Sequence, residues 1–126
     1  MAIKKYLTKD ERIRKEYLRM RNIYKKLVSD DKLKANDGLM HRAAYLRISI
    51  EDMERDLDDN GFVEMFSQSE SQIPYERERP TARLFNSLTK NYQTAMTQLN
   101  RILPDEVQVE ADDGFDNFVK ARDDFG

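Results

Sequence analysis

The 126-residue chain contains no cysteine, and it has only four glycines, three prolines and one histidine. The absence of cysteine excludes disulfides, thiolate zinc sites and thiol catalysis. No apolar run approaches the roughly 18–20 residues that span a bilayer, and the first residues lack the apolar stretch of a signal peptide. We therefore expect a soluble, intracellular protein without a membrane partner.

Catalytic motifs are missing as well. There is no G-x-x-x-x-G-K-S/T sequence and no glycine-rich loop, which argues against nucleotide hydrolysis. The single histidine, His41, has no cysteine to join it as metal ligand or nucleophile, so we interpret it as a surface residue. Ser67, Ser69 and Ser71 have no histidine or lysine arranged around them to activate a hydroxyl. We expect no enzyme, no catalytic residue, no metal and no cofactor.

One acidic segment begins like a calcium loop. Asp56, Asp58 and Asn60 offer oxygen ligands at positions one, three and five, and Gly61 follows at position six. The twelfth position is Ser67, where a calcium loop needs a bidentate glutamate. An exposed helix end that stops at Asn60-Gly61 is the preferred interpretation.

Charged residues are abundant, at 37% of the chain, and the two signs are segregated. The first 29 residues carry ten Lys and Arg against three Asp and Glu, whereas residues 103–126 carry two against eight. A basic segment attracts a polyanion such as nucleic acid, with an affinity that falls as salt rises. A merely solvated helix face is the alternative. The residues predicted to contact DNA are Lys4, Lys5, Lys9, Arg12, Arg14, Lys15, Arg19, Arg21, Lys25 and Lys26.

Three segments repeat apolar residues at alternating steps of four and three, which places them on one face of a helix. We predict helices over 8–29, 32–60 and 80–103. The apolar positions are Ile13, Tyr17, Met20, Tyr24 and Leu27 in the first, Leu39, Ala43, Leu46, Ile50, Met53 and Leu57 in the second, and Phe85, Leu88, Tyr92, Ala95, Leu99 and Ile102 in the third.

Local signals mark the ends of these helices. Thr8, followed three residues later by Glu11, has the pattern of a capping box. Gly61 follows the second helix as a stop, and Pro80 and Pro104 bracket the third. Each helix is therefore delimited by its own residues.

Narrow apolar stripes suit antiparallel hairpins and coiled coils better than a wide globular core. The expected fold class is all-α: a long antiparallel helical hairpin over 32–103, an additional basic N-terminal helix within 1–31, and an acidic, flexible tail over 104–126. Because so polar a chain gains stability by burying area against copies of itself, we expect an oligomer. The predicted oligomer-interface residues are Leu39, Leu46, Ile50, Met53, Leu57, Phe85, Leu88, Tyr92 and Leu99.

The connections leave some alternatives open. The run from Phe62 to Phe66 predicts a short extended segment at the hairpin tip, and 67–71 predicts a flexible loop. The first two helices are separated only by residues 29–31, so a DNA-reading helix-turn-helix is an alternative. The acidic tail is either a partner-docking segment or a solubilising extension. Its candidate docking residues are Phe115, Phe118 and Phe125.

The block 35–104 has a recognisable order of features. A long helix closes with the residues Glu54 to Gly61, a polar linker follows, and Glu78-Arg79-Pro80 starts a helix containing Leu84, Leu88, Tyr92, Met96, Leu99 and Leu103-Pro104. This order resembles small terminase subunits of tailed bacteriophages, in the group whose oligomerisation core is an antiparallel helical hairpin.

The resemblance implies a non-catalytic subunit of a genome-packaging motor in the cytoplasm of a bacterial host. Such subunits form rings, here expected to hold roughly eight to ten copies, and bind double-stranded viral DNA. They deliver the DNA to the large terminase subunit, which holds the ATPase and nuclease. The hairpin would then make ring contacts, the basic segment would contact DNA, and the tail would meet the large subunit. Many members have a fuller N-terminal domain, whereas only about 37 residues precede the hairpin here. The surface of the ring is therefore an alternative DNA contact.

Two other functions compete with this one. A helical coiled-coil adaptor or structural interaction protein, without nucleic-acid binding, would use its basic and acidic ends on other proteins. A small transcription regulator would share the DNA contact but would be a dimer.

Overall fold

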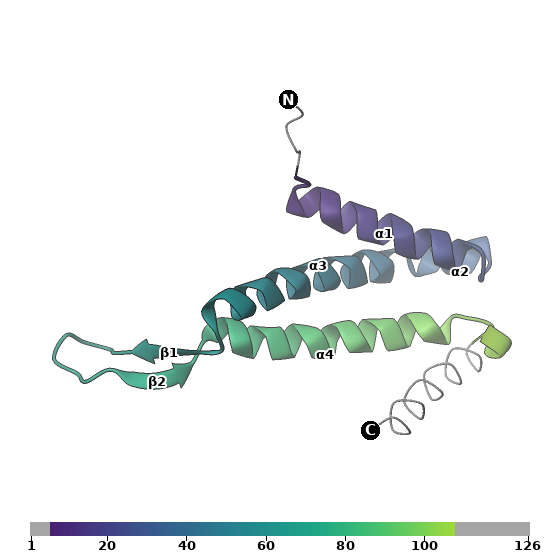
Figure 1. Ribbon diagram of the computed structural model, residues 1–126. Helices are drawn as coiled ribbons and strands as arrows, with labels where there is room; N and C mark the ends of the chain where they lie inside the picture. Colours follow the sequence, from purple (N-terminus) through teal and green to yellow (C-terminus); the bar gives the residue numbers. More distant parts are fainter. Residues whose placement is uncertain (1–5, 108–126) are drawn as a thin grey trace, which may run out of the picture.

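A computed structural model describes residues 6–107 of the chain (Figure 1). The fold is mostly helical, and a two-stranded antiparallel sheet separates its two longest helices. Within residues 6–107, no helix has the length and hydropathy that crossing a bilayer requires. The elements are α1 (Lys9–Lys25), α2 (Asp30–Ala35), α3 (Asp37–Asn60), β1 (Val63–Phe66), β2 (Tyr75–Glu78) and α4 (Pro80–Arg101).

The helix α3 is the centre of the molecule, with α4 packed antiparallel along one side and α1 along another (Figure 1). Met40 of α3 and Leu99 of α4 have no solvent-exposed surface. The basic N-terminal helix therefore shares one hydrophobic core with the hairpin. The buried cluster consists of Tyr17, Met20, Tyr24, Leu33, Met40, Ala43, Ala44, Ala95, Leu99 and Leu103.

The helical prediction is confirmed, with three corrections. The segment predicted as one helix over 32–60 is divided into α2 and α3 at Asn36, whose ψ of 12° departs from helical geometry. Ser29 starts the short α2 by accepting a hydrogen bond from the Lys32 amide at 3.3 Å. The first helix ends at Lys25, four residues early, because the chain must turn to bring Leu33 into the core. The all-α prediction also missed the sheet.

The two predicted caps next to long helices are confirmed. The Thr8 hydroxyl oxygen accepts a hydrogen bond from the Glu11 amide at 3.1 Å, which satisfies one of the free donors at the start of α1. The second cap lies at the end of α3. This helix stops at Asn60, and the Gly61 amide donates to the Leu57 carbonyl at 2.8 Å. Gly61 has a φ of +82°, a conformation that only glycine adopts without strain.

Two glycine-to-alanine substitutions are expected to change stability in opposite directions. Gly61→Ala should lower the free energy of unfolding by about 1–2 kcal/mol, because a Cβ disfavours positive φ. Gly38→Ala should raise it by about 0.5–1 kcal/mol, because Gly38 lies in α3 and a Cβ there meets no atom within 4 Å. Urea unfolding of both variants measures the difference, and a loss of stability in both would contradict it.

The strands β1 and β2, with the loop between them, form an arm over residues 62–78 that projects beyond the helices (Figure 1). The extended segment predicted at 62–66 is confirmed as β1, and its partner β2 was not predicted. Val63 pairs with Glu78 and Phe66 with Tyr75. Val63, Phe66 and Tyr75 are of the β-branched and aromatic types that strands favour.

Candidate nucleic-acid interface

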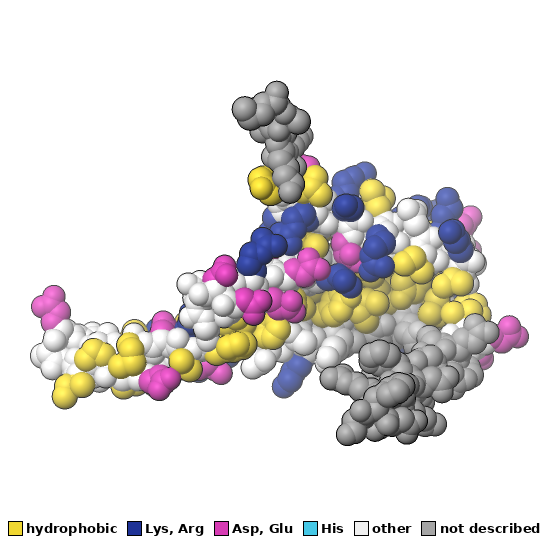
Figure 2. All heavy atoms as spheres, in the orientation of Figure 1, with side chains coloured by type: hydrophobic (Ala, Val, Ile, Leu, Met, Phe, Trp, Pro, Cys, Tyr) yellow, Lys and Arg dark blue, Asp and Glu magenta, His cyan; other side chains and the backbone are white. Residues whose placement is uncertain are grey.

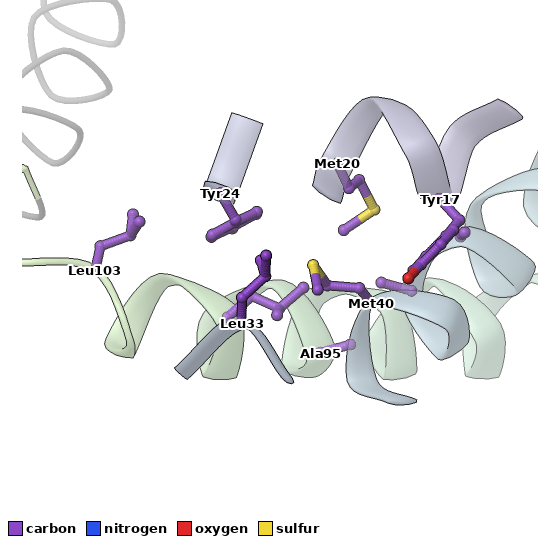
Figure 3. Close-up of a cluster of buried hydrophobic side chains, with 10 residues drawn as sticks. Tyr17, Met20, Tyr24, Leu33, Met40, Ala95 and Leu103 are labelled. Carbon is purple, nitrogen blue, oxygen red and sulfur yellow. The ribbon is translucent and has the colours of Figure 1, made fainter. Parts of the chain in front are cut away.

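The helix α1 presents its basic side to solvent because its apolar side is fixed in the core. Met20 and Met40 point toward one another, with Tyr17 and Tyr24 on either side along α1 (Figure 3). Only 2% of the Met20 surface is exposed. Since side chains at steps of three and four share a face, the residues between these positions lie on the opposite, outward face. The basic side chains of α1 therefore project from a helix that is packed into the core.

Tyr17 anchors this helix near the start of α3. Its hydroxyl donates a hydrogen bond to the Asp37 carboxylate, and its ring stacks on His41 with 3.6 Å between ring centroids. The hydrogen bond to Asp37, followed by burial, raises the pKa of Tyr17. His41 is exposed, as predicted, and its Nε2 lies 3.5 Å from the Asp37 carboxylate.

A charged network closes the flank of α1 that faces α3. Arg12 donates to Asp52 at 2.6 Å and to Glu51 at 3.5 Å. The hydrogen bond with Asp52 raises the pKa of Arg12. Because these carboxylates belong to α3, Arg12 joins the two helices and does not face open solvent.

The same network continues around Glu16, which is only 9% exposed. Its carboxylate accepts from Arg19 at 2.9 Å and lies 3.8 Å from Arg47 of α3. Arg47 also contacts Glu51 and donates to the Tyr92 hydroxyl at 3.4 Å, which brings α4 into the network. The network holds three arginines and three carboxylates, so it adds no net charge to the surface.

The predicted DNA-binding residues therefore divide into two sets. Arg12 and Arg19 are occupied by carboxylates of the chain itself. Lys9 lies 5.0 Å from the centre of the Tyr45 ring, and Arg21 is half-buried. The exposed members of the predicted set that form neither an ion pair nor a cation–π contact within residues 6–107 are Arg14, Lys15, Lys25 and Lys26. We name these four the outer basic face.

Two further cations lie next to the outer basic face and were not predicted. Lys32 and Lys34 are exposed on α2, which packs against α1 beyond the turn at residues 26–29. Both lysines flank Leu33 in the sequence. Because Leu33 is buried in the core, the side chains next to it point toward solvent. They were missed because the predicted helix over 32–60 was assigned to the hairpin.

The surface shows the consequence of this arrangement. Between residues 6 and 36 there are ten Lys and Arg against five Asp and Glu. Figure 2 shows the dark-blue cations gathered over α1, acidic residues below them, and a yellow hydrophobic band along the seam between α3 and α4. A positive surface of this kind binds phosphates without reading base sequence.

The structure also places the predicted oligomer-interface residues. Leu46, Ile50, Leu57 and Leu99 are buried within the chain, where α3 and α4 pack on each other. The other five stay partly accessible at the edges of that seam. These half-buried residues are Leu39, Met53, Phe85, Leu88 and Tyr92.

The acidic end of α3 is a structural junction. Asp56 accepts from the Asn60 side chain at 2.6 Å and from Arg79 at 3.0 and 3.1 Å. The Asn60 hydrogen bond, together with Arg79, lowers the pKa of Asp56. Within residues 6–107 no group of three or more His, Asp or Glu is placed to hold a metal ion. The segment after Gly61 forms β1, where a calcium loop would continue toward its second helix.

Several predicted residues lie outside the part of the chain that the structure describes. These are Lys4 and Lys5 of the basic segment and Phe115, Phe118 and Phe125 of the acidic tail. Comparison of the chain with protein-family models, with curated proteins and with solved structures finds no match.

Proposed function

We propose that this chain is a non-catalytic DNA-binding subunit of a phage genome-packaging terminase. It assembles into a ring, binds double-stranded viral DNA, and delivers it to the large subunit in the host cytoplasm. The observation that carries the DNA contact is the outer basic face of α1. Its four cations project from a helix fixed in the core and have no carboxylate partner within residues 6–107.

The dimensions of α1 suit a DNA backbone. Arg14 and Lys25 are eleven residues apart, which corresponds to about 16 Å along a helix. That length spans more than one phosphate of a strand, so several cations engage the same duplex. Lys32 and Lys34 extend the positive surface beyond the end of α1.

The resemblance of residues 35–104 to small terminase subunits supports the packaging role. The end of α3 at 54–61 and the start of α4 at 78–80 lie together, because Arg79 hydrogen-bonds both Asp56 and the Gly61 carbonyl. The two segments that carry the resemblance thus meet at one junction of the hairpin.

Neutralising part of the outer basic face is expected to weaken DNA binding. In the double variant Lys25→Gln/Lys26→Gln, two phosphate contacts are lost. The slope of log K against log salt should become shallower by about 2 units, and the affinity near 0.1 M salt should fall by about one to two orders of magnitude. Titration of a short double-stranded DNA across a salt series, by fluorescence anisotropy, measures both quantities.

The matched controls separate charge from folding. Lys25→Arg/Lys26→Arg keeps both charges and should bind like the native chain, and Arg55→Gln removes one exposed charge from α3 with little effect. If the native chain does not bind DNA at low salt, or if its affinity is independent of salt, the proposal fails.

One observation favours the adaptor function as the second candidate. The projecting arm exposes large hydrophobic residues, among them Met65 and Ile73, which is typical of a protein-binding surface. An adaptor would bind its partner without DNA. Native mass spectrometry distinguishes the candidates, because the packaging subunit should give a species of about eight to ten copies.

A further inference from the structure

The arm carries an unusual share of the exposed hydrophobic surface. Of the eleven large hydrophobic residues exposed within residues 6–107, five lie between Phe62 and Tyr75. Ile73 is 86% exposed and Met65 is 67% exposed. An isolated two-stranded ribbon is only marginally stable in water, so a segment of this kind gains most from a surface that covers it.

The two faces of the arm differ in a way that identifies the open one. On one face, the Arg77 guanidinium lies 3.4 Å from the centre of the Phe66 ring and pairs with Glu64 at 3.1 Å, and Tyr75 meets Phe66 edge-on. These side chains cover each other. On the other face, Val63 and Met65 have only Glu78 and Glu76 opposite them, and both hydrophobic residues are more than half exposed.

A surface that fits the open face lies elsewhere on the same chain. A hollow of about 380 Å³ follows the seam between α3 and α4, with a floor of Leu39, Leu46, Leu88 and Ala95 and with Arg42 at its edge. Three of these residues, Leu39, Leu46 and Leu88, were predicted to make contacts between copies. We name this hollow the seam groove.

The charges of the arm and of the seam groove are complementary. Between residues 62 and 78 the arm has four glutamates and one arginine, and neither Glu70 nor Glu76 forms an ion pair within residues 6–107. Arg42 likewise has no ion-pair partner there. The seam groove shares Thr94 and Gln98 with a neighbouring hollow that Lys90 and Arg101 border, so its surroundings are basic.

The arm of one copy cannot reach the seam groove of the same copy. It leaves the helices at the junction of α3 and α4 and points away from them (Figure 1). The seam groove extends back along the helices toward Leu39, near the start of α3. Two surfaces that cannot meet within one chain can meet only between copies.

We propose that the open face of the arm docks into the seam groove of a second copy of this chain. Val63 and Met65 cover Leu39, Leu46 and Leu88 of the neighbour, and Glu76 pairs with the neighbour's Arg42. Because arm and groove are different surfaces, the contact is head-to-tail, and repetition closes a ring when the rotation between copies permits it. The inference rests on the proposed ring for this closure.

A charge exchange tests the pairing directly. Met65→Asp, Arg42→Glu and Glu76→Lys are all at exposed positions, so each should fold and each should raise the dissociation constant of the assembly by at least about tenfold. The double variant Arg42→Glu/Glu76→Lys restores the opposite charges and should return to within about threefold of the native value. Sedimentation velocity over a concentration series measures the assembly, and circular dichroism checks the fold.

A cysteine pair provides an independent measurement, because the native chain has no cysteine. The double variant Met65→Cys/Thr94→Cys should form a ladder of disulfide-linked copies on oxidation, whereas Met65→Cys/Arg55→Cys should not. An assembly unaffected by Met65→Asp, a charge exchange without recovery, or equal ladders in both cysteine variants would overturn the pairing. A native chain that is monomeric would overturn it as well.

The same proteins separate this inference from the proposed function. A chain that assembles through the arm but does not bind DNA leaves the docking intact and removes the packaging role. A chain that binds DNA as a monomer keeps the DNA contact and removes the docking.

Discussion

Replacing Leu99 with alanine is expected to lower the free energy of unfolding by about 2–5 kcal/mol. Leu99 has no exposed surface, and it lies in the cluster where α1, α3 and α4 meet. The substitution removes buried methyl groups and leaves a cavity that three helices must collapse around. The free energy of unfolding of such a domain is only about 5–15 kcal/mol in total, so this single change removes a large part of its stability.

Urea unfolding of Leu99→Ala measures the loss, with Leu84→Ala as the matched control on the same helix. Leu84 is 54% exposed, so its truncation should change stability by no more than about 0.5 kcal/mol. If the two variants are equally stable, Leu99 does not join the helices into one core, and α1 behaves as a separate unit.

The apolar stripes predicted one side of each helix and missed the second side of α3. Leu46, Ile50 and Leu57 were found because they repeat on the face toward α4. Met40 and Ala44 are equally buried, on the face toward α1. One apolar stripe per helix does not reveal that a central helix packs against two neighbours. The sequence does contain the spacing of four between Met40 and Ala44, which places them on one face.

The outer basic face was predictable only in part. Sequence shows that Arg12, Arg14, Arg19 and Lys25 are cations on one helix, and all four fit a phosphate-binding surface equally well. Which of them reaches solvent depends on how α1 lies against α3, because Asp52 and Glu51 then occupy Arg12. Long-range pairing of this kind is set by packing, and no local pattern reports it.

Replacing Arg79 with alanine is expected to loosen the base of the arm and to lower the free energy of unfolding by about 1.5–3 kcal/mol, the usual contribution of a hydrogen bond to a charged group. The Arg79 side chain is 17% exposed and donates to the Gly61 carbonyl at 2.7 Å. It also binds both oxygens of Asp56, while its backbone amide donates to the Phe62 carbonyl at 2.9 Å. One residue thus ties the end of α3 to the start of α4.

Amide hydrogen exchange and urea unfolding together test this junction. In Arg79→Ala, protection at β1 and β2 should fall more than protection in α1, because only the arm depends on the junction. Arg79→Lys should be intermediate, since one ammonium cannot bind the carboxylate with two parallel bonds. The control is Arg83→Ala, four residues on, where an 82% exposed side chain lies 3.6 Å from Glu78 and truncation should have little effect.

The same test shows whether Arg79 has a structural role at the start of α4. If Arg79→Ala changes protection and stability as little as Arg83→Ala does, the Arg79 side chain does not stabilise the junction at the start of α4. Gly61 and Pro80 alone would then delimit the two helices, as glycine and proline do in many proteins. If only Arg79→Ala loosens the arm, Arg79 holds the end of α3, the start of α4 and the base of the arm together as one unit.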